Sequence, residues 1–193
     1  MSAHRLTTAA TALPISVADA KDQSRILSDA EGTYVRKLIE RATKRCENIC
    51  KRAFITQTWT LTMDGFDDCT YVTNGMIYVP RPPLISVTSI AYLDTNGDSQ
   101  TWASTQYRVD ATSEPGRIET AYGVVYPTTR GVIGDVTIVH TAGYGASSSS
   151  VPEDLQHAIV VLAAHFFETR EGERDMPQAV YDLLEPFIME QYA

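Results

Sequence analysis

The residues that could do acid-base or metal chemistry stand in contexts that do not favour it. His157 and His165 lie eight residues apart on one helical stretch, and Glu168 follows three residues later. The spacing of a zinc-binding HExxH helix is absent, and the flanking residues are Ala, Val, Leu and Phe. Asp67 and Asp68 are adjacent in a turn-like stretch with no partner base nearby. We therefore predict that these side chains are structural, that no residue is catalytic, and that the chain is not an enzyme.

The glycines, serines and cysteines also lack the setting of a nucleotide, hydrolase or zinc site. The AGYG sequence at 142–145 is followed by no Lys-Ser/Thr pair, and no GxGxxG pattern precedes a helix. The four serines at 147–150 form no nucleophile elbow. The cysteines are odd in number, and no second Cys or His pair follows Cys46 and Cys50. We predict no cofactor, no metal, and reduced, buried thiols at Cys46, Cys50 and Cys69.

Length and composition are those of an ordinary soluble protein. The chain has 193 residues, of which 44% are hydrophobic and 21% charged, enough for one domain with a sizeable insertion. No apolar run approaches the roughly 20 residues that span a bilayer, so we predict no membrane association. The first 16 residues lack the continuous apolar segment of a secretory signal.

Charge is distributed unevenly along the chain. The net charge is -8, yet residues 28–52 hold seven basic and four acidic residues (+3), and residues 151–193 hold two basic and nine acidic residues (-7). This asymmetry is typical of solvated helix faces, or it permits a positive helix of one subunit to meet a negative segment of another. The negative total argues against a conventional nucleic-acid-binding protein.

The N-terminal part of the sequence predicts an arm followed by helices. Residues 1–13 are rich in Thr and Ala without periodicity and are expected to form a flexible arm. Ser16 with Asp19 predicts the start of a short helix, and Ser28 with Glu31 forms a capping box that opens a long amphipathic helix. The apolar positions of that helix recur at spacings of three and four: Val35, Leu38, Ile39, Ala42, Cys46, Ile49, Cys50 and Ala53.

From residue 54 the hydrophobic period changes to two, which predicts strands. In the first of them Ile55, Gln57, Trp59, Leu61 and Met63 share one face, and four threonines share the other. Turn chemistry at 94–98 (DTNGD) favours a hairpin, and the regular spacing predicts an antiparallel meander or small barrel. The further strands are expected at 76–79, 85–93, 105–111, 116–122 and 135–142.

After a flexible joint at 143–152 the helical period returns. The segment 158–167 (AIVVLAAHFF) is apolar around nearly its whole circumference, so we expect its own fold or neighbouring subunits to cover it on every side. A final helix is expected to be kinked or broken at Pro186. Its apolar residues are Val180, Leu184, Phe187 and Ile188.

This order of elements predicts an α+β fold. An α-helical core, made of the long N-terminal helix and a C-terminal helix pair, would carry an antiparallel β-rich insertion. The expected boundaries are a flexible arm at 1–13, a helical core at 14–53 and 151–193, and the insertion at 54–150.

The segment 79–84 (VPRPPL) places three prolines ahead of a strand. Because proline removes a backbone donor, we expect the segment to lie at an edge, a crossing or an exposed arm. We predict that Arg81 sits on a stiff, extended stretch and packs at an edge within the subunit or against the next one. The alternative is a simple lead-in to the strand.

The order and spacing of several segments are similar to those of a known family. The chain resembles the head-to-tail connector proteins, also called adaptor or head-completion proteins, of long-tailed bacteriophages and gene transfer agents, although its last 20 residues resemble nothing as clearly. The segments that carry the resemblance are ISVADAK (15–21), KRAFITQTWTLTMDGF (51–66), VPRPPLISVTSIAYLDTNGDSQTW (79–102), YRVD (107–110), PGRI (115–118), HTAGYG (140–145) and VPEDLQHAIVVLAAHFFETRE (151–171).

The resemblance implies a structural virion protein at the head-tail neck, assembled in the host cytoplasm. Members of the family form a homo-oligomeric ring, usually dodecameric, under the portal protein. A neck stopper or tail-completion protein docks below it, and genomic DNA passes through the lumen. The helical core builds the ring, and the β-rich insertion marks one branch of the family. The resemblance assigns no residue roles.

Physical reasoning supplies candidate contacts between subunits or with partners. A closed ring needs two different complementary surfaces on every copy, which an over-apolar helix and opposite charges would provide. A negative overall charge also suits a lumen through which DNA must slide. The candidate interface residues are Arg41, Arg45, Arg81, Val160, Val161, Ala164, Phe167 and Glu185.

Two other classes of function remain open. A β-rich tail or carbohydrate-binding module would expose a cluster of aromatic side chains. A DNA-binding protein would retain DNA in a salt-dependent way through the basic residues of 36–52. The aromatic candidates are Trp59, Trp102, Tyr107, Tyr122 and Tyr126, and the basic ones are Arg36, Lys37, Arg41, Lys44, Arg45, Lys51 and Arg52.

Overall fold

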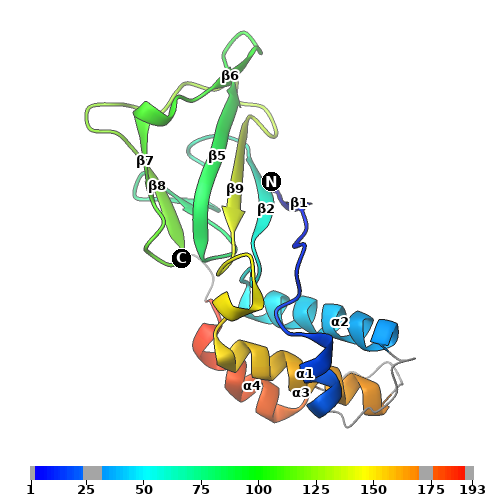
Figure 1. Ribbon diagram of the computed structural model, residues 1–193. Helices are drawn as coiled ribbons and strands as arrows, with labels where there is room; N and C mark the ends of the chain where they lie inside the picture. The colour runs from blue at the N-terminus through cyan, green and yellow to red at the C-terminus, as the bar shows by residue number, and fades with distance from the viewer. Residues whose placement is uncertain (1–2, 24–31, 170–175, 190–193) are drawn as a thin grey trace. The chain divides into compact units, whose positions relative to one another are not determined.

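Helices and strands occupy two separate units in the computed structural model, which describes residues 3–23, 32–169 and 176–189 (Figure 1). Ala10–Ile55 and Tyr144–Met189 form the helical unit, and the other described residues, chiefly Thr56–Gly143, form the sheet unit. The predicted mixed α+β class is confirmed.

The helical unit is built around two long helices, α2 (Gly32–Cys50) and α3 (Glu153–Thr169). They pack with α1 (Val17–Gln23) and α4 (Gln178–Leu184), and α4 continues as a 3-10 turn, η4 (Glu185–Phe187). The break predicted at Pro186 is confirmed, because the α-helix ends before it. The predicted capping box at Ser28 and Glu31 lies outside the described residues. A short 3-10 turn, η3 (Ser148–Ser150), precedes α3.

The apolar periodicity correctly identified the core of this unit. Of the eight predicted positions on the long helix and its exit, all but the partly buried Ile49 are buried. The core of the unit also contains side chains from the other three helices, among them Ala20, Leu155, Ile159, Leu162, Val180 and Leu184.

The predicted start of α1 is confirmed by a reciprocal cap. The Asp19 amide donates to Ser16 Oγ at 3.1 Å, and Ser16 Oγ donates to Asp19 Oδ2 at 2.7 Å. Because the cap satisfies amides that have no partner within the helix, it stabilises the first turn.

Replacing Ser16 by alanine is expected to lower the free energy of unfolding of the helical unit by about 1 kcal/mol. Urea denaturation followed by far-UV circular dichroism measures this loss. The control is Ser16→Thr, which keeps the capping hydroxyl and should cost much less. Equal losses in the two variants would contradict the cap.

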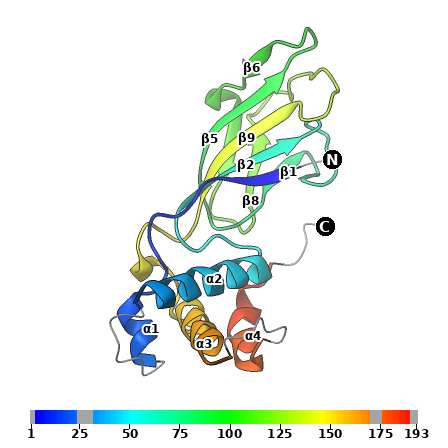
Figure 2. The same ribbon diagram turned by 90° about the vertical axis from the view of Figure 1, so that its right-hand side faces the viewer.

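The sheet unit holds two antiparallel sheets. The larger has the order β1-β2-β9-β5-β6 and the smaller the order β3-β4-β8-β7 (Figures 1 and 2). The strands are β1 (Ala3–Thr8), β2 (Gln57–Met63), β3 (Val72–Thr73), β4 (Met76–Val79), β5 (Leu84–Leu93), β6 (Ser99–Thr101), β7 (Tyr107–Asp110), β8 (Gly116–Thr120) and β9 (Val136–Ala142), with a 3-10 turn η2 (Ser104–Gln106).

The six predicted strands are confirmed, but the predicted meander or small barrel is wrong. Strand β9 lies between β2 and β5, so strands far apart in the sequence pair with each other. One apolar cluster, with Leu61 and Ile138 from the larger sheet and Ile77 and Ile118 from the smaller, forms the core of the unit. Burial of a shared core by two sheets determined the arrangement, and turn spacing alone does not specify it.

The flexible arm predicted at residues 1–13 is wrong for Ala3–Thr8, which forms strand β1. Figure 2 shows β1 beside β2, and the register pairs His4 with Leu61 and Leu6 with Trp59. All side chains of β1 except His4 are exposed, so the strand is held chiefly by backbone pairing with β2 and its sequence shows no apolar alternation.

The boundaries of the helical unit also differ from the predicted ones. Residues 10–13, 54–55 and 144–150 belong to the helical unit rather than to the arm or the insertion. A parallel bridge joins Ile55 to Gly145, and the Tyr144 amide donates to the Phe54 carbonyl at 3.0 Å. These contacts extend the unit beyond its helices.

Candidate interaction surfaces

Helix α3 buries one side in its own unit and leaves the other partly exposed. Leu155, Ala158, Ile159, Leu162 and Ala163 are buried. The four residues predicted to cover a neighbour remain partly exposed in the single chain: Val160, Val161, Ala164 and Phe167. The other helices of the unit therefore bury one side of α3, and the apolar side chains on its other side remain partly exposed to solvent.

Aromatic contacts link the end of α3 to α2. The Arg41 guanidinium lies 4.3 Å from the centroid of the Phe166 ring, a favourable cation–π geometry. The rings of Tyr34 and Phe167 are 6.1 Å apart, and Tyr34 is exposed. This end of the helix pair is therefore both apolar and cationic.

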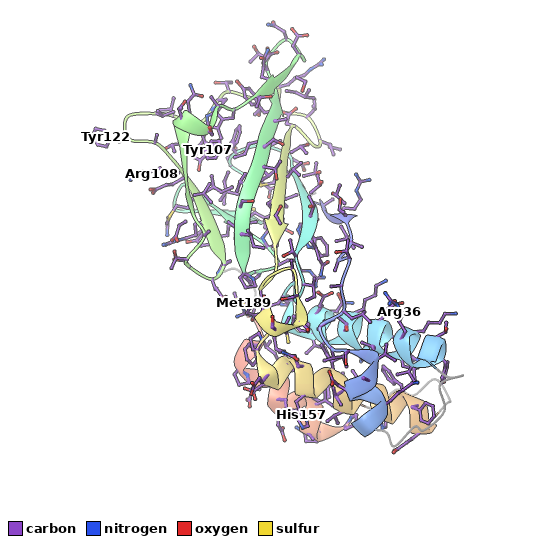
Figure 3. The ribbon with its side chains drawn as sticks, in the orientation of Figure 1. Arg36, Tyr107, Arg108, Tyr122, His157 and Met189 are labelled. Carbon is purple, nitrogen blue, oxygen red and sulfur yellow. The ribbon has the colours of Figure 1, made fainter. Side chains whose placement is uncertain are left out.

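The other charged candidates lie on the surface of the helical unit. Arg45 is exposed on α2, and Glu185 is exposed at the start of η4. Figure 3 shows Arg36 on α2, where it pairs with Glu40 at 3.2 Å. Arg52, a member of the basic set considered for DNA binding, is buried and therefore cannot present its guanidinium to phosphates.

Arg81 does not lie on an extended stretch, as the sequence predicted, but in a bend with a φ of 64°. The segment crosses from β4 in the smaller sheet to β5 in the larger one, and Pro80 and Pro82 are buried. A segment that crosses from one sheet to another needs no backbone N–H groups for strand pairing, so it tolerates prolines, which lack this donor. The Arg81 guanidinium lies 5.1 Å from the centroid of the Trp59 ring in the same chain.

Trp59 is also part of a stack that the sequence did not reveal. The His4 ring is 4.6 Å from Trp59 and 5.4 Å from His140, nearly parallel to both. Burial, with smaller contributions from His140 and Arg81, lowers the pKa of His4 to about 3. Burial lowers the pKa of His140 to about 4. Trp59 and His140 occupy paired positions of β2 and β9, a register that the sequence alone does not show.

The aromatic side chains do not form the exposed cluster that a carbohydrate-binding module would need. Trp59 and Trp102 are buried, and Tyr107 and Tyr126 are partly buried against the core of the sheet unit. Tyr122 alone of the five candidates is exposed, and its exposure of 103% is that of a free side chain.

Tyr122 projects from a turn with a defined structure (Figure 3). The Val124 amide donates to the Ala121 carbonyl at 2.9 Å, and Gly123 has a φ of 76°, which a residue with a side chain rarely adopts. At the base of the loop the Tyr126 hydroxyl donates to the Gly75 carbonyl at 2.8 Å.

Two neighbouring hollows lie beside this loop. One, of about 320 Å³, is lined by Met76, Val109 and charged residues of β7 and β8. The other, of about 530 Å³, shares Met76 and Glu119 with the first and reaches Val125 in the loop. Val125 itself is 82% exposed.

An ionic network forms part of the first hollow. Asp110 accepts hydrogen bonds from Ser113 Oγ at 2.6 Å and from Arg117 Nε at 3.1 Å, and these contacts hold its pKa well below the usual range. Arg108 lies 3.8 Å from Glu119. The hollow therefore presents the Arg117 guanidinium, whose position is restrained by Asp110, and the more exposed Arg108 guanidinium beside Glu119.

The cysteines follow the prediction only in part. Cys46 and Cys50 are buried, and burial raises their pKa values to about 12 and about 11. Cys69 is exposed, because it lies in the loop that joins β2 to β3 rather than in a strand. Within the described ranges, no three His, Cys, Asp or Glu side chains gather so as to hold a metal ion. Among the same residues, no helix has both the length and the apolar character that crossing a membrane requires.

Comparison with solved structures gives matches over almost the whole chain. A chain in the neck of an empty gene transfer agent (GTA) particle, computed with C6 symmetry, is 26% identical with a TM-score of 0.81, covering 99% of this chain and 97% of that one. A chain of the virion of a native GTA particle gives the same identity and TM-score, covering 98% and 97%. A chain in the neck of a native GTA particle, computed with C12 symmetry, is 30% identical with a TM-score of 0.73, covering 99% and 97%. No protein-family model and no curated protein matches the chain.

Proposed function

The chain belongs to the head-tail neck proteins of phage-like particles, which are structural components and not enzymes, and from this premise we propose that it forms a homo-oligomeric ring connecting head to tail. The ring would lie under the portal protein, bind a neck stopper or tail-completion protein below, and let the genome pass through its lumen. Assembly would take place in the host cytoplasm, with a dodecamer as the expected stoichiometry.

The observation that carries the proposal is the likeness of 99% of this chain to neck proteins at up to 30% identity. A match confined to one unit would indicate a shared domain, whereas this one spans both units. The neck structures were computed with sixfold and twelvefold symmetry, which is consistent with repeated copies around an axis.

The surfaces of the helical unit are consistent with such contacts. The partly exposed face of α3, with Val160 and Val161, would be covered by the neighbouring copy. Arg41, Arg45 and Glu185 are exposed charges of opposite sign, which would orient one copy on the next.

Electron-microscopy class averages of particles and of the purified protein test this function. We expect a ring between the portal and the tail, and antibody or tag labelling of the chain should mark that ring. Particles whose neck lacks the chain, or a label found elsewhere on the tail, would overturn the proposal.

Polar substitution of the α3 face is expected to weaken ring assembly without unfolding the subunit. The double variant Val160→Thr and Val161→Thr keeps the side-chain shape and removes apolar contact area, so ring occupancy in particles should fall several-fold. Quantitative class averaging measures occupancy, and thermal denaturation checks folding. The matched control is Ala179→Ser, at an exposed position of α4 in the same unit. Unchanged occupancy in the double variant would contradict a role of this face.

A further inference from the structure

We propose that the β8–β9 loop of one copy docks in the hollow of about 320 Å³ on the smaller sheet of a second copy of this chain. The Tyr122 ring would be held there between the side chains of Arg108 and Arg117. The inference rests on the proposed ring and adds a contact made by the sheet unit. The occupant of the hollow is a neighbouring copy, and the contact is head-to-tail.

The protruding part is exposed and restrained at the same time. Tyr122 is 103% exposed and Val125 is 82% exposed, so neither is covered by its own chain. The turn hydrogen bond below Tyr122 and the Tyr126 hydroxyl bond to Gly75 restrain the loop. The Tyr126 ring also packs 5.1 Å from Phe66 and 5.4 Å from Trp102. A restrained aromatic loses little conformational freedom on binding, and tyrosine is enriched among residues that dominate interfaces.

The receiving part has chemistry that suits an aromatic ring. The hollow of about 320 Å³ combines apolar surface from Met76 and Val109 with the guanidinium groups of Arg108 and Arg117. A guanidinium binds the face of an aromatic ring, and its own carboxylate partner keeps it in place. Asp110 holds Arg117 in this way, whereas Arg108 remains 73% exposed beside Glu119 and is free to swing over a ring.

The symmetry of the related necks favours another copy of this chain as the partner. Rotational symmetry of order six or twelve requires head-to-tail contacts, in which each copy meets its two neighbours through two different surfaces. The sheet unit carries both parts, and Tyr122 does not fill the hollow of its own chain. Figure 3 shows Tyr122 projecting beyond the strand that carries Arg108.

Cysteine cross-linking in assembled particles tests the contact directly. Tyr122→Cys and Arg108→Cys are made as separate chains in a Cys69→Ser background, because Cys69 is the exposed native thiol among the described residues. The two chains are co-produced in small amounts with a Cys69→Ser chain that keeps Tyr122 and Arg108, so that intact contacts hold the ring, and purified particles are oxidised. We expect covalent dimers only when both variants are present. Particles that contain the ring but yield no mixed dimer overturn the inference and leave the ring proposal standing. Dimers from Tyr122→Cys alone also overturn it, because they indicate a symmetric contact.

Substitution of the loop tip provides a second measurement. Tyr122→Ser should lower ring occupancy in particles about tenfold or more, whereas Tyr122→Phe should retain it because the aromatic ring is kept. Ile133→Ser, which removes another apolar side chain that is 86% exposed and lines neither hollow, is the matched control. A normal ring in Tyr122→Ser, or a loss of attached tails with the ring intact, overturns the inference. A wild-type neck without this chain overturns the ring proposal as well.

Discussion

Lowering the pH from about 6.5 to about 4 is expected to reduce the free energy of unfolding of the sheet unit by about 3 kcal/mol through His140 alone. His140 is fully buried in β9, and its pKa falls from 6.5 in the unfolded chain to about 4 in the folded one. The unfolded state therefore binds the proton first. The stabilising contribution of neutral His140 is complete above pH 6.5, declines as the pH falls, and is lost near pH 4.

His4 should act in the same direction over a wider range, since its pKa is lowered to about 3. The two rings stack on each other, and Arg81 is a cation that acts on His4, so protonation of His4 adds charge to a site that already holds a positive group. Because His4 is the main inward contact of β1, we expect this strand to separate from β2 before the rest of the sheet unfolds.

Urea denaturation at a series of pH values measures the effect, with tryptophan fluorescence as the signal because Trp59 and Trp102 both lie in the sheet unit. The variant His140→Leu should show roughly half of this decline between pH 6.5 and 4, because His4 still takes up a proton in the unfolded chain over the same range. The control is His157→Gln, at an exposed position of α3 in the helical unit (Figure 3), and should leave the pH profile unchanged. A profile in His140→Leu identical to that of the wild type would contradict the assignment.

Most secondary-structure elements could be predicted because the side chains alternate with the period of the element. Strand β2 shows this best: Gln57, Trp59, Leu61 and Met63 are buried, and the intervening threonines are partly exposed. Strands β1, β3 and β6 were missed because they are short or expose nearly all their side chains. Their existence depends on free backbone groups of neighbouring strands, which have no signature in their own residues.

The candidate surfaces were less predictable than the fold. Composition marked α3 as too apolar for a solvated helix, but only the packed unit shows that Leu162 faces inward and Val161 remains partly exposed. Periodicity also gave no indication of Tyr122, because exposure at a loop tip depends on the turn around Gly123 and on distant anchors such as Gly75. The bend at Arg81 likewise depends on the order of strands in the two sheets.

Replacing Arg52 by methionine is expected to lower the free energy of unfolding of the helical unit by about 2–4 kcal/mol. Arg52 is buried just after α2, where Nε donates to the Phe187 carbonyl at 2.6 Å. Its other nitrogens donate to the Tyr144 hydroxyl at 3.3 Å and to Met189 Sδ at 3.4 Å. One guanidinium thus joins three segments of the unit, and methionine, although similar in length, would leave the Phe187 carbonyl of this part-buried hydrogen bond without its donor.

Chemical denaturation followed by far-UV circular dichroism measures the loss, and hydrogen exchange locates it. The Met189 amide donates to the Cys50 carbonyl at 3.1 Å, so it should exchange faster once the guanidinium no longer holds this segment. Arg52→Lys should lose part of the stability, because an ammonium cannot reach all three acceptors in the planar geometry of a guanidinium. Arg45→Met, at an exposed site on α2, is the matched control and should change stability by less than about 0.5 kcal/mol. If Arg52→Met and Arg45→Met unfold at the same denaturant concentration, Arg52 does not fasten the C-terminal segment, and packing around α4 alone must hold it.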